Sequence, residues 1–307
     1  MNIAIAEPVV RSDFVTKRFS TRVERDVKFG VGGVGLNSPG GLRYRDLKLD
    51  VYSPVGAGDQ PKPALILAFG GAFHRGSKET DEFGDAEGMS TPVAEYCDLF
   101  AQRGYVCFCI DYRLTQEDCD PGVTPTIAPE EPMNKDRVNV VRGMLGLPPA
   151  TDDELRRGIE AATDDMVKAV SFVRSNARAY GVDISRIAIG GFSAGAVISL
   201  AAAFVERAPV AAVLSLSGRA SERTRKQCIT GAKDEAAILM FVGERDLPVI
   251  AEGAPAMEKH FSTIGGAHRL VHLANATHFY PKTTRTPDGR DVETTIAEFL
   301  RGALRLG

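Results

Sequence analysis

A serine between two glycines is the first feature of the sequence that could carry out chemistry. Gly191-Phe192-Ser193-Ala194-Gly195 matches the pattern GxSxG. In a chain with 31 glycines this pattern alone is weak evidence, but its flanks strengthen it. RIAIGGF before the serine has the composition of a strand, and AGAVISLAAAFVE after it that of a helix, so we expect the serine on a sharp strand-to-helix turn. A plain helix-capping serine is the alternative, which would not explain both glycines.

A serine hydroxyl is a poor nucleophile unless a histidine, itself held by a carboxylate, accepts its proton. The chain contains five histidines: His74, His260, His268, His272 and His278. We expect His278 to lie in a loop after the last strand and before the terminal helix, where it could reach Ser193. His260 and His272 fall inside a predicted helix and strand, and His268 opens that strand at the end away from the serine. His74 follows a glycine turn and could line a pocket.

The carboxylate is expected at the carboxyl end of a strand, because parallel strands bring these ends to one edge of a sheet. Asp246 follows the apolar run AAILMFVG and precedes Leu247-Pro248, so it is the first candidate. Glu244 lies two residues earlier and is the alternative. Ser193, Asp246 and His278 are then the predicted catalytic residues, in that chain order.

Acyl transfer also needs donors for the oxygen that becomes negatively charged in the transition state. The turn Phe69-Gly70-Gly71-Ala72-Phe73 directly follows the apolar run ALILA. We expect the backbone amides of Gly71, Ala72 and Ala194 to form this oxyanion hole. A plain loop or a phosphate-binding loop is the alternative, but the sequence contains no GxxxxGK[ST] and no GxGxxG that opens a helix here.

The elements that must position these residues alternate between β-rich and helical patterns, which is typical of a mostly parallel sheet covered on both faces. An alternating run at 46–52 predicts an outer strand. Nearly continuous apolar runs predict strands buried on both sides at 64–69, 105–112, 186–192, 211–217 and 236–243, followed by a last strand at 268–274. Helical patterns cover 90–103, 151–180, a segment from 194, 249–264 and 292–306.

The segment 115–150 contains six prolines and interrupts this alternation. We expect it to be a cap or lid insertion with a short helix at 136–145. Thr151-Asp152-Asp153-Glu154 predicts the capping box of the helix that follows. No repeat or linker is evident, so residues 1–307 are predicted to form one domain.

The amino-acid composition argues against some classes of binding partner. The 307 residues contain 37 basic and 40 acidic side chains, a net charge of −3, which gives no basic field for nucleic acid or for a membrane surface. No apolar run is long enough to span a membrane, and the first residues do not read as a signal peptide. Five cysteines without a close-spaced framework predict reduced, buried thiols, such as Cys107 and Cys109, and a cytoplasmic location.

Several segments together resemble the esterase branch of the α/β-hydrolases, which includes hormone-sensitive-lipase-like carboxylesterases and feruloyl and acetylxylan esterases. They occur in the family's order: LDVYSP (49–54), FGGAFHRGSK (69–78), DYRL (111–114), DISRIAIGGFSAGA (183–196), VGERDLPV (242–249) and THF (277–279). The chain departs from the usual HGGG turn at Phe69 and Ala72, and Phe192 stands where the lipase-like group usually has an aspartate. The resemblance also implies that Asp111 and Arg113 form a buried pair that braces the loops near the oxyanion turn.

The expected fold is therefore the α/β-hydrolase fold with a cap insertion. The expected function is that of a serine carboxylesterase that hydrolyses a small-to-medium ester through an acyl-enzyme, with activity that rises as imidazole loses its proton. No metal and no cofactor are implied. The alternatives are a peptidase or amidase with the same triad and a catalytically silent ligand-binding relative. The oligomeric state is left open, with a homodimer as one possibility.

Overall fold

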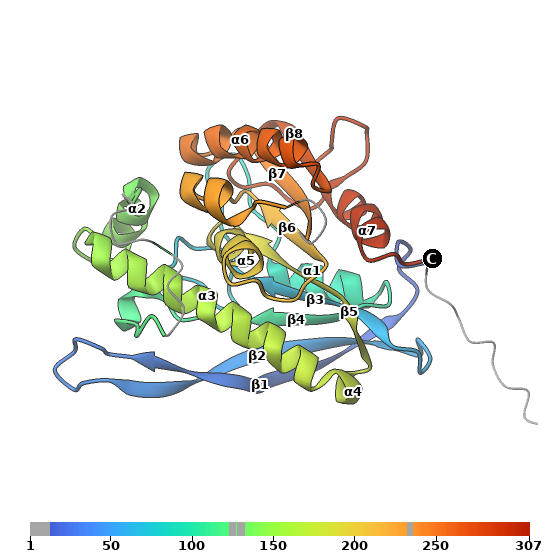
Figure 1. The fold of residues 1–307 in the computed structure, drawn as a ribbon, viewed down its shortest axis with the longest axis horizontal. Coiled ribbons are helices and arrows are strands. Elements are labelled where there is room, and N and C mark those ends of the chain that lie inside the picture. The colour runs from blue at the N-terminus through green and yellow to red at the C-terminus, as the bar shows by residue number, and fades with distance from the viewer. Residues whose placement is uncertain (1–12, 123–126, 128–132, 232–235) are drawn as a thin grey trace, which may run out of the picture.

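The computed structural model describes residues 13–122, 127, 133–231 and 236–307, which form an eight-stranded mixed sheet between layers of helices (Figure 1). The strands are β1 (Ser20–Val34), β2 (Arg43–Val55), β3 (Lys62–Ala68), β4 (Val106–Ile110), β5 (Val182–Phe192), β6 (Ala212–Leu216), β7 (Ala237–Arg245) and β8 (His268–Thr277). Their order across the sheet is β1-β2-β4-β3-β5-β6-β7-β8. The pairs β1–β2 and β2–β4 are antiparallel and all other neighbours are parallel.

The nearly continuous apolar runs form the centre of the sheet, as predicted. Every residue of β4 and β6 is buried, and β3 is buried after its first residue. All five cysteines are free of disulfides, and Cys107 and Cys109 are fully buried in β4. A strand with helices on both faces has no polar side, which is why its sequence does not alternate.

Strand β1 was not predicted from the sequence, and β2 was predicted as an outer strand of the sheet. Strand β1 forms the edge instead and pairs along β2 from Ser20↔Val55 to Val34↔Arg43. Its register shifts twice, between Glu24 and Val27 and between Lys28 and Gly30. Such irregularities break the two-residue alternation from which an edge strand is predicted.

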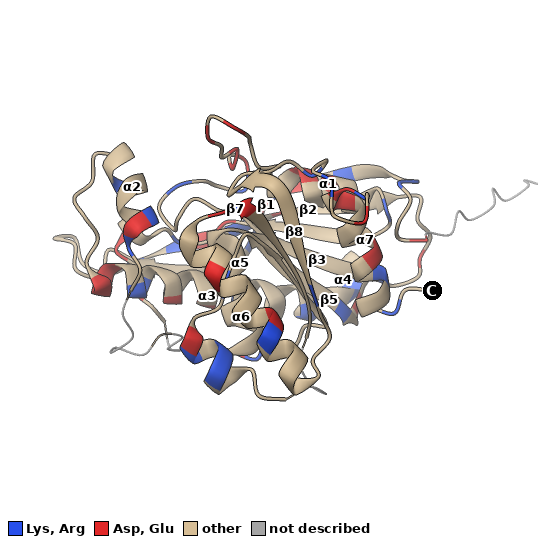
Figure 2. Cartoon of the chain, turned by 90° about the horizontal axis from the view of Figure 1, so that it is seen from above, with Lys and Arg blue, Asp and Glu red and all other residues tan. Residues whose placement is uncertain are grey.

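Helices cover both faces of the sheet. They are α1 (Val93–Ala101), α2 (Asp136–Met144), α3 (Asp152–Ser175), α4 (Ala177–Tyr180), α5 (Ala194–Phe204), α6 (Pro248–Ile264) and α7 (Val292–Ala303), with short helical turns at Thr115–Glu117 and Thr224–Cys228. Figure 2 shows α3, α5 and α6 on one side of the sheet and α1 on the other. Helix α7 joins α1 there, because Glu293 of α7 forms a buried ion pair with Arg103, just after α1.

The predicted insertion contributes α2, which lies near the start of α3 (Figure 1). This confirms the short helix, whereas residues 123–126 and 128–132 of the insertion lie outside the described part of the chain. Thr151 and Glu154 form the predicted capping box of α3. Among the described residues, no helix is long and apolar enough to cross a membrane.

Candidate active site

Ser193 stands between the end of β5 and the first residue of α5, at a turn with unusual backbone geometry. Its φ is 52° and its ψ is −111°, a strained combination for a residue with a side chain. The Ser193 amide donates to the Leu216 carbonyl of β6 at 2.8 Å, which holds the turn against the neighbouring strand.

The flanking glycines are needed because the turn packs against the end of β3. A Cβ atom on Gly191 would lie 2.2 Å from the Ala68 carbonyl oxygen, and one on Gly195 would lie 2.0 Å from the same atom. The glycine pattern around Ser193 therefore has a steric cause. The collision is with the adjacent strand as well as across the turn itself, where the Gly191 Cβ would also meet Gly195.

The structure brings together the three residues predicted as a triad. His278 Nε2 lies 2.9 Å from Ser193 Oγ, and His278 Nδ1 lies 2.6 Å from Asp246 Oδ1. His278 and Asp246 are 4% and 7% exposed, so bulk water competes little for these hydrogen bonds. If Nδ1 donates to the carboxylate, Nε2 is left as an acceptor for the serine proton, which is the arrangement that a general base requires.

Asp246 is held by hydrogen-bond donors that could not be recognised from the sequence pattern. Its Oδ2 accepts from Ser217 Oγ at 2.6 Å and from the Gly243 amide at 3.1 Å, while Oδ1 accepts from the Leu247 amide at 2.8 Å. Tyr280 Oη lies 3.2 Å from Ser217 Oγ on the other side. Burial raises the pKa of Tyr280 well above the ordinary value, so this phenol stays protonated. The sequence did offer one signal for the role of Ser217, because this residue directly follows the buried strand β6.

The alternatives that the sequence left open lie elsewhere. Glu244 is exposed and accepts from the Asn275 amide. His268 contacts the Gly266 carbonyl and Ser262, and His260 contacts the Ile229 carbonyl. None of these side chains forms a hydrogen bond with Ser193 or His278 in the described part of the chain.

The turn after β3 lies beside Ser193, since Gly71 and Ala72 border a pocket with it. Gly71, Ala72 and Phe73 all have positive φ, at 98°, 54° and 62°. Glycine is required at position 71, because a Cβ there would lie 2.0 Å from the Arg75 carbonyl oxygen. Ala194 is the first residue of α5, so its amide has no acceptor within the helix. The amides of Gly71, Ala72 and Ala194 are thus available for an oxyanion, and this role remains a proposal.

Aromatic residues hold this turn at the position where the esterases that the sequence resembles usually have a histidine. The Phe69 ring stacks on Tyr112 with centroids 4.3 Å apart and an interplanar angle of 19°. The Tyr112 hydroxyl lies 2.8 Å from the Gly70 carbonyl oxygen and 3.0 Å from that of Phe69. The stacked Phe69 ring and the Tyr112 hydroxyl therefore hold the turn in place of the histidine.

His74 connects the same turn to helix α2. Its Nδ1 lies 2.8 Å from the Ala72 carbonyl oxygen, and its Nε2 lies 3.2 Å from Arg142 Nη1. His74 is fully buried, and this burial is the main reason why its pKa is lowered, with a further contribution from the Arg142 charge. The neutral ring can donate to the carbonyl and accept from the guanidinium, so it links the candidate oxyanion turn to the insertion.

The predicted pairing of Asp111 with Arg113 is wrong, although both residues are structural. The Arg113 guanidinium binds Asp165 and Asp164 of α3, at 2.8 and 3.0 Å. Asp111 instead accepts from the Lys78 amide at 2.8 Å. Asp111 and Arg113 lie two positions apart just after β4, yet they bind different partners, which could not be predicted from their spacing in the sequence.

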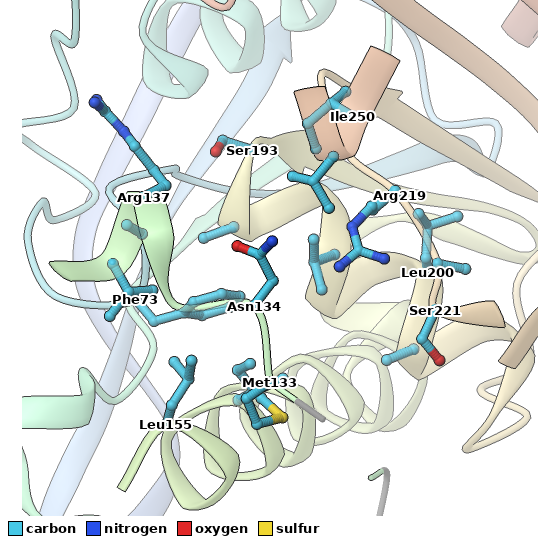
Figure 3. Close-up of a pocket in the computed structure, with 18 of the residues that line it drawn as sticks. Phe73, Met133, Asn134, Arg137, Leu155, Ser193, Leu200, Arg219, Ser221 and Ile250 are labelled. Atoms are coloured by element: carbon cyan, nitrogen blue, oxygen red, sulfur yellow. The ribbon is translucent and has the colours of Figure 1, made fainter. Parts of the chain in front are cut away.

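A cavity of about 180 Å³ opens beside Ser193, mostly apolar and bordered by α2, α3, α5 and α6 (Figure 3). Its lining includes Phe73, Met133, Val138, Leu155, Ile159, Ala194, Val197, Leu200 and Ile250. The polar groups at its wall include Asn134 and Arg219. This is the composition of a pocket that binds an apolar chain and orients it with a few polar contacts.

One group of carboxylates outside this site could be mistaken for a metal site. Oxygens of Asp26, Asp50 and Glu79 lie within 4.8 Å of one another. The Lys78 ammonium binds all three, at 2.8 Å from Asp50 and 3.1 Å from Asp26 and also against Glu79. The buried lysine balances their charge, so they need no cation.

Known proteins are similar to this chain in sequence over part of its length and in fold over most of it. Residues 150–284 match the family described as Phospholipase/Carboxylesterase. MGS-M1, an alpha/beta hydrolase enzyme from a Medee basin deep-sea metagenome library, superposes with a TM-score of 0.58 and 14% identity, over 94% of this chain and 99% of that chain. The chain has the α/β-hydrolase fold.

Other similar structures are those of esterase 2 of the planctomycete Thermogutta terrifontis. Its propionate-bound form has a TM-score of 0.53 and 19% identity, over 76% of this chain and 80% of that chain. The form phosphorylated by paraoxon has a TM-score of 0.56 and 19% identity, over 84% and 89% of the two chains. No curated protein matches the sequence significantly.

Proposed function

We propose that this α/β hydrolase is a serine carboxylesterase that cleaves small-to-medium carboxylic esters. The observation that carries the proposal is the continuous hydrogen-bonded series Ser193, His278 and Asp246 at the mouth of an apolar cavity. The partial match to a carboxylesterase family and the likeness to esterase structures, one of them with bound propionate, support it.

In the proposed mechanism His278 accepts the Ser193 proton while Oγ attacks the ester carbonyl carbon. Asp246 orients the imidazole and stabilises its positive charge, and the amides of Gly71, Ala72 and Ala194 stabilise the oxyanion. The bond to the alcohol oxygen then breaks, and His278 gives that oxygen its proton. Water repeats these steps on the acyl-enzyme and releases the acid.

A panel of p-nitrophenyl esters, from acetate to long chains, tests this function. We expect turnover of the shorter acyl chains with falling kcat/KM once the chain exceeds the cavity. A butyryl anilide included in the panel separates the alternatives: preferential turnover of the anilide would replace the esterase proposal by an amidase. No turnover of any member would favour a silent ligand-binding relative.

A further inference from the structure

A second, much smaller pocket lies on the other side of Ser193. Its volume is about 10 Å³, and the residues that line it include Arg75, Phe83, Arg137, Ser193, His278 and Phe279. The large apolar cavity shares Ala72, Arg137 and Ser193 with it, but His278 borders only the small pocket. The Ser193 hydroxyl therefore lies between a large, mostly apolar cavity and a small pocket that His278 borders.

Two arginines face the small pocket. The Arg75 guanidinium lies over the Phe83 ring at 4.9 Å, and that of Arg137 lies over the Phe279 ring at 5.6 Å. Figure 3 shows Arg137 extending away from Met133 and Asn134 of the large cavity. Aromatic faces hold both cations in place without neutralising them.

Neither arginine has a carboxylate partner within 4.0 Å in the described part of the chain, and Arg75 Nε is buried without a hydrogen-bond partner there. The fully buried arginines differ, because Arg103 pairs with Glu293 and Arg113 pairs with Asp165. A cation left without an anion next to a reaction site has an unused capacity to bind one.

The two charges also act on each other. Burial and then repulsion from Arg75 lower the pKa of Arg137, while Asp85 raises it. Arginine stays charged in proteins, so Arg137 keeps its positive charge despite this lowering. An anionic group between them would relieve the repulsion and satisfy the Arg75 donor.

The small pocket is the place for the leaving alcohol. His278 must protonate the alcohol oxygen as it departs, so the alcohol leaves along the side that His278 borders. The acyl chain is then assigned to the large apolar cavity.

We propose that the preferred alcohol carries a carboxylate, so that the substrate is an O-acylated hydroxy acid whose carboxylate binds Arg75 and Arg137. This inference rests on the proposed esterase function. Ser193 Oγ bonds to the acyl carbon, the bond to the hydroxy-acid oxygen breaks, and that oxygen takes the proton from His278. Hydrolysis of the acyl-enzyme by water completes the cycle without an oxidant or cofactor.

The test compares O-butyryl glycolate with neutral O-butyryl glycolamide, which has nearly the same shape. We expect wild-type kcat/KM to be about tenfold or more higher for the glycolate ester, because a partly buried pair of arginines stabilises its carboxylate. Arg75→Gln and Arg137→Gln should each reduce this ratio about tenfold. Arg22→Gln is the matched control, since Arg22 is an exposed arginine on edge strand β1 and its loss should leave the ratio unchanged.

Ionic strength gives a second measurement that needs no variant. The wild-type ratio should fall as NaCl increases from about 20 mM to about 500 mM, because salt screens charge pairs at the mouth of a site. A ratio near one in the wild type, or a high ratio that both glutamine variants retain, would overturn the inference. A stronger preference for O-butyryl ethanolamine than for the glycolate ester would also overturn it.

The phosphate alternative is tested by butyryl glycol phosphate, and its preferred turnover over the glycolate ester would replace the carboxylate assignment. A failure of the proposed esterase function would give a different result. In that case neither ester, nor p-nitrophenyl butyrate, would be hydrolysed. Turnover of neutral p-nitrophenyl butyrate without preference for the carboxylate would leave the esterase proposal intact and reject only the inference about the alcohol.

Discussion

At the scale of single residues, the site depends on how Asp246 is held rather than on its presence alone. Three donors fix its two oxygens, and Ser217 supplies the shortest of these hydrogen bonds, at 2.6 Å. A carboxylate with fixed oxygens keeps the His278 ring in one orientation and one tautomer. Glu244, only two residues away, is exposed and cannot substitute for it in this conformation.

Asp246→Asn should lower kcat for p-nitrophenyl butyrate by about 10³–10⁴, because the neutral amide favours the wrong tautomer of His278 and does not stabilise its charge. Steady-state kinetics with both proteins at equal concentration measures this. Glu244→Gln is the matched control and should keep its activity. Equal losses in both variants would show that the Asp246 contact has no special role.

At the scale of elements, the sequence predicted what depends on composition and missed what depends on contacts between distant segments. The buried strands and the turn at Ser193 could be predicted, because apolar runs and glycine spacing have local causes. Strand β1 could not, since its register shifts remove the alternation. Neither the His74 to Arg142 contact nor the Ser217 to Asp246 contact has a local signature, because 68 and 29 residues separate the partners.

The His74 to Arg142 contact predicts that the insertion helps to position the oxyanion turn. Arg142→Met preserves the aliphatic part of the side chain but removes the donor to His74. We expect kcat to fall about tenfold, a cost of about 1.4 kcal/mol in the transition state, with a smaller change in KM. Arg142→Lys should recover part of the loss.

Arg174→Met is the control for this comparison, because Arg174 of α3 donates to the Ile184 carbonyl and lies outside the site. Thermal denaturation should show whether either protein is destabilised as a whole. If Arg142→Met raised KM alone and left kcat unchanged, α2 would bind substrate without acting on the turn.

At the scale of the whole molecule, the fold brings the ends of β3, β5, β6 and β7 to one edge, so residues far apart in sequence meet there. The same packing also buries ionisable groups outside the site, and these affect stability. Asp81, between β3 and α1, accepts from the Val93 amide at 2.8 Å, while its Oδ1 has no partner among the described residues. Burial is the main reason why the pKa of Asp81 is raised to about 7. One domain for residues 1–307 with a cap or lid insertion at 115–150 stays a prediction, and a homodimer stays open.

The raised pKa of Asp81 makes stability depend on pH. The folded state favours the protonated carboxyl, so its contribution is complete below about pH 4, the ordinary range of an aspartate, and is lost as pH rises toward 7. Asp81→Asn should therefore be more stable than the wild type at pH 8, by roughly 1–3 kcal/mol, and similar to it at pH 4. Urea unfolding at both pH values measures this.

Asp59→Asn, a change at an exposed aspartate, is the control and should show no such difference. A wild type and an Asp81→Asn variant whose free energies of unfolding stay parallel between pH 4 and pH 8 would contradict the assigned ionisation.

The most direct test of the whole account is to find the atom that attacks the substrate. A fluorophosphonate probe reacts with an activated serine, and peptide mass spectrometry then locates the adduct. We predict one adduct, on Ser193, in the wild type, none in Ser193→Ala, and strongly slowed labelling in His278→Ala. An unlabelled wild type, or an adduct at another residue that persists in Ser193→Ala, would contradict the account.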